Sequence, residues 1–167
     1  ETKYSWGVNG IYGQASLGYK DTYFIDGSLR RDVSSTLPKD KNTYSYPAVS
    51  GSIIVSNLFK RDWLSFAKIR ANYAEVGNDA KPLSLINTFS RSTNFHNQPV
   101  YSLPNVNKNP QLSPERTKSL EFGLEANFLR KRVGFDVSYY KTNSIDQIVS
   151  GAVSSSSGFT NAVVNGG

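Results

Sequence analysis

The chain of 167 residues contains no cysteine and only one histidine, His96. The absence of cysteine excludes disulfides, zinc–thiolate sites and cysteine nucleophiles. The single histidine finds no partner in this chain for a metal site or a hydrolytic triad. The sequence also lacks the G-x-S-x-G, H-E-x-x-H and phosphate-binding-loop motifs of common enzymes. We therefore expect a protein that is not an enzyme and that uses neither a metal nor another cofactor.

Long hydrophobic runs are absent as well. No segment approaches the roughly 18 consecutive apolar residues that a membrane-spanning helix requires. This absence does not exclude a transmembrane β-barrel, because barrel strands are short and alternate between apolar and polar residues. Hydrophobic residues make up only 38% of the chain, yet 13% of it is aromatic. Such a balance is typical of antiparallel β structure rather than of a helical bundle.

The net charge of +6 raises the question of an anionic partner. The basic residues are spread along the chain, and their densest cluster, 130–132, falls in a predicted tight turn. A solvated turn explains this cluster without a nucleic acid. We expect no nucleic-acid partner.

The clearest pattern lies between residues 119 and 140. Apolar and polar side chains alternate over 119–128, and the alternation restarts at 133 after the basic turn. Side chains on a strand alternate between faces with period two. The segment therefore predicts a long β-hairpin whose ionic face carries Glu121, Glu125 and Asp136.

The same alternation predicts further strands over 10–20, 23–32, 44–56 and 66–76, and a weak strand over 145–149. The connections are short at 20–22 and 129–132, medium at 57–65, and long at 33–43, 77–115 and after 143. Outer-membrane barrels have short periplasmic turns and long extracellular loops. The rhythm therefore favours a segment of an antiparallel transmembrane β-barrel.

The polar faces of these strands carry ionisable groups of both signs: Asp26, Arg30, Lys68, Arg70, Glu121, Glu125 and Asp136. Such groups suit the wet interior of a wide barrel. They suit equally the water-facing side of a soluble β-sandwich, because alternation alone does not separate the two architectures. A soluble carbohydrate-binding or adhesion module thus stands as the alternative.

Two carboxylate pairs invite comparison with a glycosidase. Glu121 and Glu125 lie four residues apart on one strand, or about 13 Å, which is too far for either glycosidase geometry. The separation of Asp26 and Asp136 depends on the strand order. A ladder of charges is the simpler interpretation of these groups.

Several motifs resemble one known family. The segment NPQLSPERT at 109–117 is followed by SLEFGLE at 119–125, similar to a signature of TonB-dependent outer-membrane transporters. Further segments resemble the SusC/RagA branch of that family: SLRRDVSS at 28–35, YPAVS at 46–50, IRANY at 69–73, VGN at 76–78, SGF at 157–159 and Asn165. The resemblance covers nearly the whole chain in the order of the family.

The resemblance implies a barrel of about 22 strands with a plugged lumen, of which this chain would supply about six adjacent strands. Residues 1–167 would form part of the barrel domain, in the bacterial outer membrane. The sequence begins and ends within its pattern, so we expect the plug, the TonB-binding segment and the C-terminal strands to lie outside this chain.

The resemblance also implies function. The full protein would import oligosaccharides or peptides, with energy from the TonB–ExbB–ExbD complex through the missing N-terminal part and with a SusD-like lipoprotein capping the barrel. The ionisable residues named above would face the lumen. Phe95, His96 and Tyr101 would contact substrate or lid, or else pack their loop against itself. Rings at strand ends would form girdles at the membrane interfaces: Tyr12, Tyr19, Tyr23, Phe59, Trp63, Phe66 and Phe128.

Overall fold

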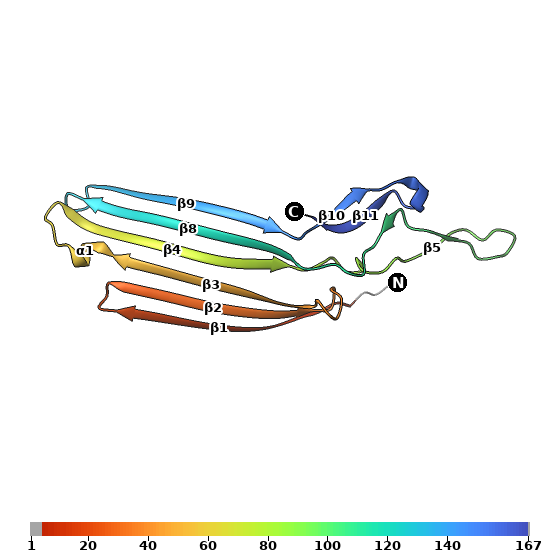
Figure 1. The fold of residues 1–167 in the computed structure, drawn as a ribbon, viewed down its shortest axis with the longest axis horizontal. Coiled ribbons are helices and arrows are strands. Elements are labelled where there is room, and N and C mark those ends of the chain that lie inside the picture. Colours follow the sequence, from red (N-terminus) through yellow and green to blue (C-terminus); the bar gives the residue numbers. More distant parts are fainter. Residues whose placement is uncertain (1–4, 167) are drawn as a thin grey trace.

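The computed structural model describes residues 5–166 and consists almost entirely of antiparallel strands (Figure 1). Six long strands form the main sheet: β1 (Val8–Tyr19), β2 (Tyr23–Ser34), β3 (Thr43–Ile54), β4 (Leu64–Asn78), β8 (Glu115–Phe128) and β9 (Val133–Ile145). The smaller elements are α1 (Val55–Leu58), β5 (Ser90–Arg91), β6 (Tyr101–Ser102), β7 (Val106–Asn107), β10 (Gln147–Ala152), η1 (Ser155–Ser157) and β11 (Asn161–Gly166).

The main sheet has the order β1-β2-β3-β4-β8-β9, so each strand pairs with its neighbours along the chain once β5–β7 are set aside. This meander is the topology expected for adjacent wall strands of a barrel. Two small sheets lie beyond it, β10-β11-β7 and the β5-β6 hairpin. The predicted all-β antiparallel fold is confirmed.

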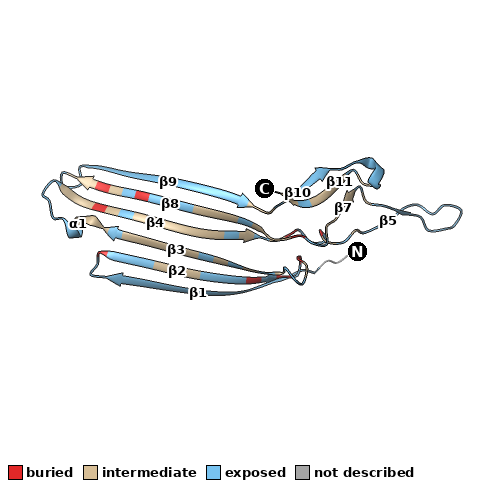
Figure 2. Ribbon diagram, viewed as in Figure 1, coloured by how far each residue is buried: buried red, intermediate tan, exposed pale blue. Residues whose placement is uncertain are grey.

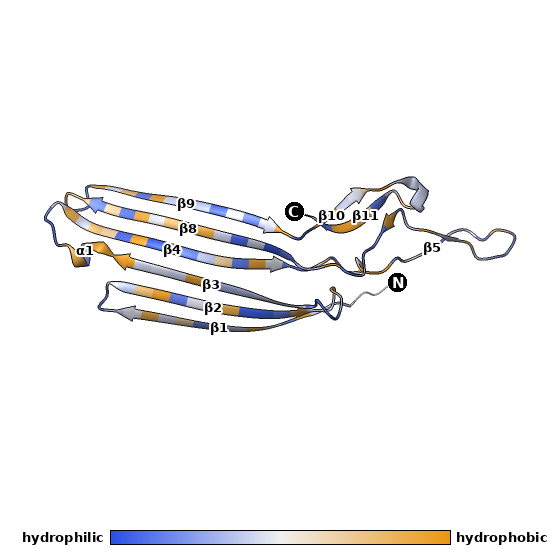
Figure 3. Cartoon of the chain, viewed as in Figure 1, coloured by the Kyte–Doolittle hydropathy of each residue, from blue (hydrophilic) through white to orange (hydrophobic). Residues whose placement is uncertain are grey.

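The cross-strand register separates an apolar face from a polar face. One row across the sheet is Leu17, Ile25, Gly51, Ala71, Phe122 and Tyr139. The neighbouring row, on the opposite face, is Ser16, Asp26, Ser50, Asn72, Glu121 and Tyr140. Figure 3 shows the resulting banding of hydrophobic and hydrophilic residues along β4 and β8. We call these the apolar face and the polar face.

Short and long connections lie at opposite ends of the sheet (Figure 1). The β1–β2 and β8–β9 turns and the α1 connector lie at one end, which we call the turn end. Lys20 and Asp21, and likewise Leu129, Arg130 and Lys131, adopt positive φ angles that close these turns. The connections β2–β3 and β4–β8, with β10 and β11, lie at the other end, the loop end. The predicted short turns and the long β4–β8 connection are confirmed, but the connection predicted to be long at 33–43 spans only residues 35–42 and is no longer than the one between β3 and β4, at 55–63.

A small apolar core lies at the loop end. Leu37, Ala80 and Leu112 are buried there, and Leu112 is completely inaccessible. Partly buried residues of β3, of the β4–β8 connection, of β10 and of β11 pack against them: Tyr44, Leu85, Ile148 and Val163. The long connections are therefore packed together at their bases.

The main sheet is a single layer. Figure 2 shows that β1 and β9, its two edges, are almost wholly exposed, whereas the strands between them are partly shielded. Among the described residues no second sheet covers the apolar face. A soluble β-sandwich buries such a face against a partner sheet, so this architecture does not support the soluble alternative.

The structure differs from the sequence-based predictions in local detail. β4 begins at Leu64 rather than at 66, because a bulge lies between Leu64 and Phe66. The strand predicted over 44–56 ends at Ile54, because the one-turn helix α1 includes its last two residues and the first two of the predicted connector at 57–65. The weak strand predicted over 145–149 is divided between the end of β9 and β10. No helix in the part of the chain that the structure describes has the length and hydrophobicity to cross a membrane.

Candidate functional site

All the ionisable residues predicted to line a lumen lie on the polar face. Asp26 pairs across the strands with Ser50, Arg30 with Tyr46, and Lys68 with Glu125. Glu125 in turn lies opposite Asp136 on β9. The alternation thus assigned their common face correctly.

Arg70 joins β4 to β9 across the intervening strand β8. Its Nη2 and Nη1 atoms donate to the two carboxylate oxygens of Asp136 at 2.9 and 3.2 Å, and Nη2 also donates to Ser138 Oγ at 2.8 Å. The Nε atom of Arg70 lies 3.9 Å from Glu121 Oε1. This bidentate contact is the strongest geometry an arginine offers a carboxylate, and it offsets the repulsion between the paired carboxylates of Glu125 and Asp136.

Gly123 makes this contact possible. It lies directly opposite Arg70 on β8, and a Cβ atom there would lie 2.7 Å from both Cγ and Cζ of Arg70 and would clash with Nε. The arginine therefore crosses β8 only because residue 123 has no side chain.

We predict that Gly123→Ala displaces Arg70 and lowers the stability of the folded full-length protein by about 1 kcal/mol, since overpacking and a lost ion pair combine. The urea midpoint of unfolding measures this change. Gly27→Ala is the matched control, because a Cβ at Gly27 meets nothing within 4 Å. Equal midpoints for the two variants would contradict the role assigned to Gly123.

A second polar cluster occupies the polar face near the loop end. Arg30 Nε donates to the Asp32 carboxylate at 2.8 and 3.0 Å, and Asp32 is only 4% exposed. Ser34 and Thr36 donate to the Asp79 carboxylate at 2.6 and 3.1 Å. These groups adjoin an open hollow of about 580 Å³, which Trp6, Tyr44 and Tyr46 also line.

This cluster combines aromatic rings with carboxylates, which suits a polar ligand with apolar faces. Neither Asp32 nor Asp79 was singled out from the sequence. The period-two alternation over 23–32 could reveal on which face of the sheet Asp32 lies. No local signal could reveal Asp79, because 45 residues separate it from Ser34.

The motif at 109–117 holds several segments together at the loop end. Leu112 fills the small core, and Asn109 Oδ1 accepts from the Gln111 backbone N–H at 2.9 Å. Asn165 binds the backbone of Ser113 twice, accepting at 2.9 Å and donating at 2.9 Å. Glu115 accepts from Asn78 at 3.2 Å and from the Ile148 N–H at 2.8 Å. The motif therefore ties the β4–β8 connection to β10 and β11.

Phe95, His96 and Tyr101 lie apart from the polar face. They belong to a hairpin built on β5 and β6 that projects from the loop end (Figure 1). The rings of Phe95 and His96 meet edge to face at 4.4 Å between centroids. Phe95 and Tyr101 nevertheless remain 69% and 61% exposed. Their packing within the loop is thus partial.

Aromatic rings also gather on the apolar face at the turn end. Trp63 stacks on Phe128, and Phe128 on Phe135, with centroids 5.8 and 5.9 Å apart. Tyr19 and Tyr23 pair at 6.4 Å. The predicted girdle is wrong at Tyr12 and Phe66, which pair with Arg30 and Asn127 on the polar face.

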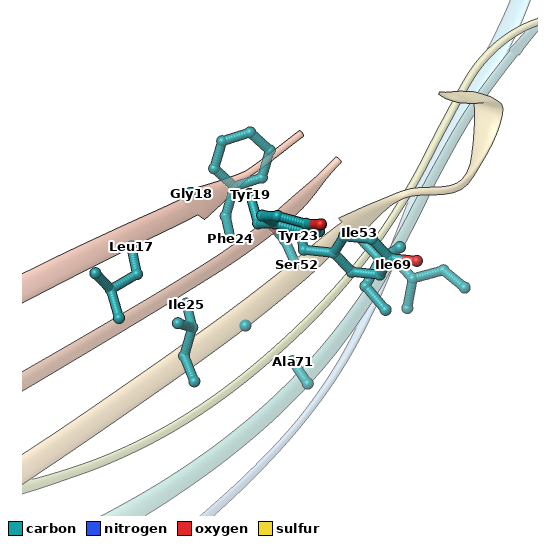
Figure 4. Close-up of a pocket in the computed structure, with 11 residues that line it drawn as sticks. Leu17, Gly18, Tyr19, Tyr23, Phe24, Ile25, Ser52, Ile53, Ile69 and Ala71 are labelled. Atoms are coloured by element: carbon teal, nitrogen blue, oxygen red, sulfur yellow. The ribbon is translucent and has the colours of Figure 1, made fainter. Parts of the chain in front are cut away.

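A groove of about 410 Å³ crosses the apolar face close to Tyr19 and Tyr23 (Figure 4). Leu17, Ile25 and Ile69 also line it. The lining contains no Asp, Glu, Lys, Arg or His. The groove therefore suits a hydrocarbon chain and offers nothing to a charged substrate.

Neither of the two carboxylate pairs considered from the sequence has the geometry of a glycosidase. Three strands separate β2 from β9, and the row of Asp26 ends at Tyr140, four residues from Asp136. Asp26 and Asp136 are therefore offset by about 19 Å across the sheet and by about 13 Å along it. Their separation exceeds both carboxylate geometries used in glycoside hydrolysis. Within residues 5–166, no group of three or more histidine, aspartate or glutamate side chains could hold a metal ion.

Comparison with known proteins agrees with this geometry. The family model described as TonB dependent receptor-like, beta-barrel matches residues 1–167. TonB-dependent receptors P26 and P39 of Formosa agariphila are each 26% identical to the chain, over 96% and 95% of its length. The chain spans only 17% and 16% of those two proteins.

Solved structures share the fold. The RagAB peptide importer in its closed-closed state matches 96% of this chain with a TM-score of 0.87 at 22% identity, and the match covers 18% of that chain. The siderophore receptor PirA from Pseudomonas aeruginosa matches 95% of this chain with a TM-score of 0.60 at 16% identity, over 28% of its own length. The resemblance seen in the motifs is confirmed, and the chain belongs to the TonB-dependent receptor β-barrel family, a family of outer-membrane receptors and transporters rather than enzymes.

Proposed function

We propose that the chain forms adjacent wall strands of a TonB-dependent importer in the bacterial outer membrane, with the apolar face against lipid and the polar face toward the lumen. One observation carries the proposal. On the central strands the large apolar residues are exposed while the charged residues are half-buried: Phe122 is 49% and Leu124 41% exposed, whereas Arg70, Glu121 and Glu125 are of intermediate exposure. Water-soluble sheets show the reverse arrangement, whereas a lipid-facing wall requires this one.

The polar face has the chemistry of a wet channel wall. Its charges are of both signs and are partly paired, as in the contacts from Arg70 to Asp136 and from Arg30 to Asp32. The Arg70–Asp136 pair is partly exposed, whereas Asp32 is buried beneath Arg30. We propose that Asp26, Arg30, Lys68, Arg70, Glu121, Glu125 and Asp136 face the lumen and its plug.

The loop end would then lie outside the cell, since outer-membrane barrels place their long loops there. The β5–β6 hairpin presents several exposed apolar side chains in a segment that the small core anchors at its base: Ile86, Phe89, Phe95, Val100, Tyr101 and Leu103. An exposed apolar patch on a projecting element is typical of a protein interface. We propose that it contacts a SusD-like lipoprotein capping the barrel.

The cargo of the full protein would be a peptide or an oligosaccharide. The likeness of fold to the RagAB peptide importer supports a peptide. The hollow beside Asp32 and Tyr46, at the loop end of the polar face, offers both rings and carboxylates to an entering substrate. Energy would come from TonB–ExbB–ExbD through parts of the protein outside this chain.

The double substitution Phe95→Ala with Tyr101→Ala tests the lid contact. Removing two exposed rings from a protein interface costs several kcal/mol when the rings are anchors. We expect the outer-membrane level of the full-length protein to stay unchanged, while co-purification of the capping lipoprotein and substrate uptake fall at least tenfold. Affinity purification from solubilised membranes measures the first effect, and an uptake assay measures the second.

Thr93→Ala with Gln98→Ala in the same hairpin is the control, because it removes polar side chains and leaves the rings. Its lipoprotein yield should match the wild type. Full retention of the lipoprotein by the Phe95/Tyr101 variant would refute the proposed contact surface.

A further inference from the structure

The apolar face carries charge only near the loop end. On the six long strands, the apolar face contains no Asp, Glu, Lys or Arg between the turn end and the row of Tyr73 and Leu120, with one exception. The exception is Lys141, which lies in that row opposite Leu120. Above that row lie the remaining charged side chains of this face: Arg31, Glu75, Arg116 and Lys118. Basic groups thus border the apolar band along its loop-end edge.

Three of these cations are neighbours on β8 and β9. Lys118 lies opposite Asn143, and Lys141 lies opposite Leu120, so the two lysines are diagonal neighbours about 7–8 Å apart. Arg116 lies two residues along β8 from Lys118, or about 7 Å. Long flexible side chains at these spacings can converge on one anionic group. We call Arg116, Lys118 and Lys141 the basic triad.

The triad is only partly neutralised. Glu75 Oε1 lies 3.9 Å from Lys118 Nζ, and Glu75 also accepts a hydrogen bond from Tyr73. Arg116 shares an open hollow with Asp40 and Asp146 but has no carboxylate oxygen within 4.0 Å, and Lys141 has none either, among residues 5–166. Three cations against one paired carboxylate leave a positive excess at the edge of an apolar surface.

We propose that the basic triad binds the phosphate headgroup of an outer-leaflet glycolipid whose acyl chains lie on the apolar face below it. The inference rests on the proposed orientation of the sheet in the outer membrane. Lysine and arginine form short, charge-assisted hydrogen bonds with phosphate. Leu120, Phe122 and Tyr139 continue directly below the triad as an uncharged surface for the acyl chains. Charge and apolar area together select an amphiphile that carries phosphate.

Cations at the turn end provide a contrast. Lys20 and Arg130 lie in the turns themselves, beyond the last strand residues, and adopt positive φ angles there. Both side chains are exposed and neither lies on a strand; Lys20 lies over the Tyr19 ring, with its Nζ 5.1 Å from the ring centroid. They are therefore matched controls for loss of charge without loss of the triad.

The test uses the full-length protein, purified in detergent and stripped of lipid. Binding of phosphorylated lipid A, of dephosphorylated lipid A and of inorganic phosphate is measured by native mass spectrometry. We expect Lys118→Gln with Lys141→Gln to weaken binding of phosphorylated lipid A about 30-fold, since each lysine near an anionic surface is worth about a factor of five. Lys20→Gln with Arg130→Gln should leave it unchanged. Dephosphorylated lipid A should bind the wild type as weakly as phosphorylated lipid A binds the triad variant.

Equal affinity of both double variants for phosphorylated lipid A would overturn the proposal. Inorganic phosphate binding as tightly as the lipid would overturn it too, because the site would then recognise a free anion. Membrane fractionation separates this failure from a failure of the proposed function. A wild-type protein absent from the outer membrane refutes the orientation itself, whereas a correctly located protein with an inert triad refutes only the lipid site.

Discussion

Phe122→Arg in the full-length protein is expected to abolish assembly in the outer membrane, and Ile53→Arg to weaken it. Phe122 lies mid-way along β8 on the apolar face and is 49% exposed. Ile53 lies on the same face in the row of Tyr23, toward the turn end, and is 38% exposed. An arginine on the lipid face of a barrel costs about 2–4 kcal/mol near the bilayer midplane and about 0–1 kcal/mol near the interfaces. Outer-membrane fractionation with a heat-dependent gel shift measures the loss.

The neighbouring position supplies the control. Ser52 precedes Ile53 on the same strand and faces the other side of the sheet, opposite Phe24 and Arg70. Ser52→Arg should therefore assemble to nearly the wild-type level. Equal tolerance of arginine at both positions would mean that the two faces meet the same solvent, and the proposed orientation would be wrong.

Leu112→Ala is expected to loosen the loop end while leaving the main sheet assembled. Leu112 is fully buried among Leu37, Ala80 and partly buried residues of β10 and β11. Truncating a buried leucine to alanine costs about 2–5 kcal/mol, and here that cost falls on a core of very few side chains. Hydrogen exchange should accelerate by at least tenfold in the β4–β8 connection and in β10.

Leu103→Ala is the comparison for this experiment, because Leu103 lies in the same connection and is 46% exposed. Its exchange pattern should resemble the wild type. If Leu112→Ala leaves the loops fully protected, the small core is not what holds them together. If it unfolds the main sheet as well, the loop end and the sheet form one cooperative unit rather than two.

The long strands could be predicted because period-two alternation is a local property. Each strand of the main sheet meets a different environment on each face, so the alternation of its own apolar and polar residues distinguishes the two faces. The hairpin over 119–140 is the clearest case. The β5, β6 and β7 strands, of two residues each, are too short to show any period. The bulge between Leu64 and Phe66 interrupts the alternation, so the first residues of β4 could not be recognised from their period.

The shared face of the ionisable residues was predictable, but their contacts were not. The contact from Arg70 to Asp136 depends on the pairing of β4 with β8 and on Gly123 lying beneath the arginine side chain. The bonds between Asn165 and Ser113 join segments 52 residues apart. Tyr12 and Phe66 lie near strand ends, as girdle residues do, but their pairing with Arg30 and Asn127 places them on the polar face.

The assignment of lipid to one face and water to the other is tested most directly by spin labels along β8. Because this chain contains no cysteine, single cysteines at positions 119–125 give clean labelling sites once any cysteine elsewhere in the full-length protein is replaced. We predict that molecular oxygen, which concentrates in lipid, reaches labels at Leu120, Phe122 and Leu124, while a polar nickel chelate reaches labels at Ser119, Glu121 and Glu125. Labels whose accessibility does not alternate along β8, or chelate access to labels on both faces, would contradict the assignment of one face to lipid and the other to water.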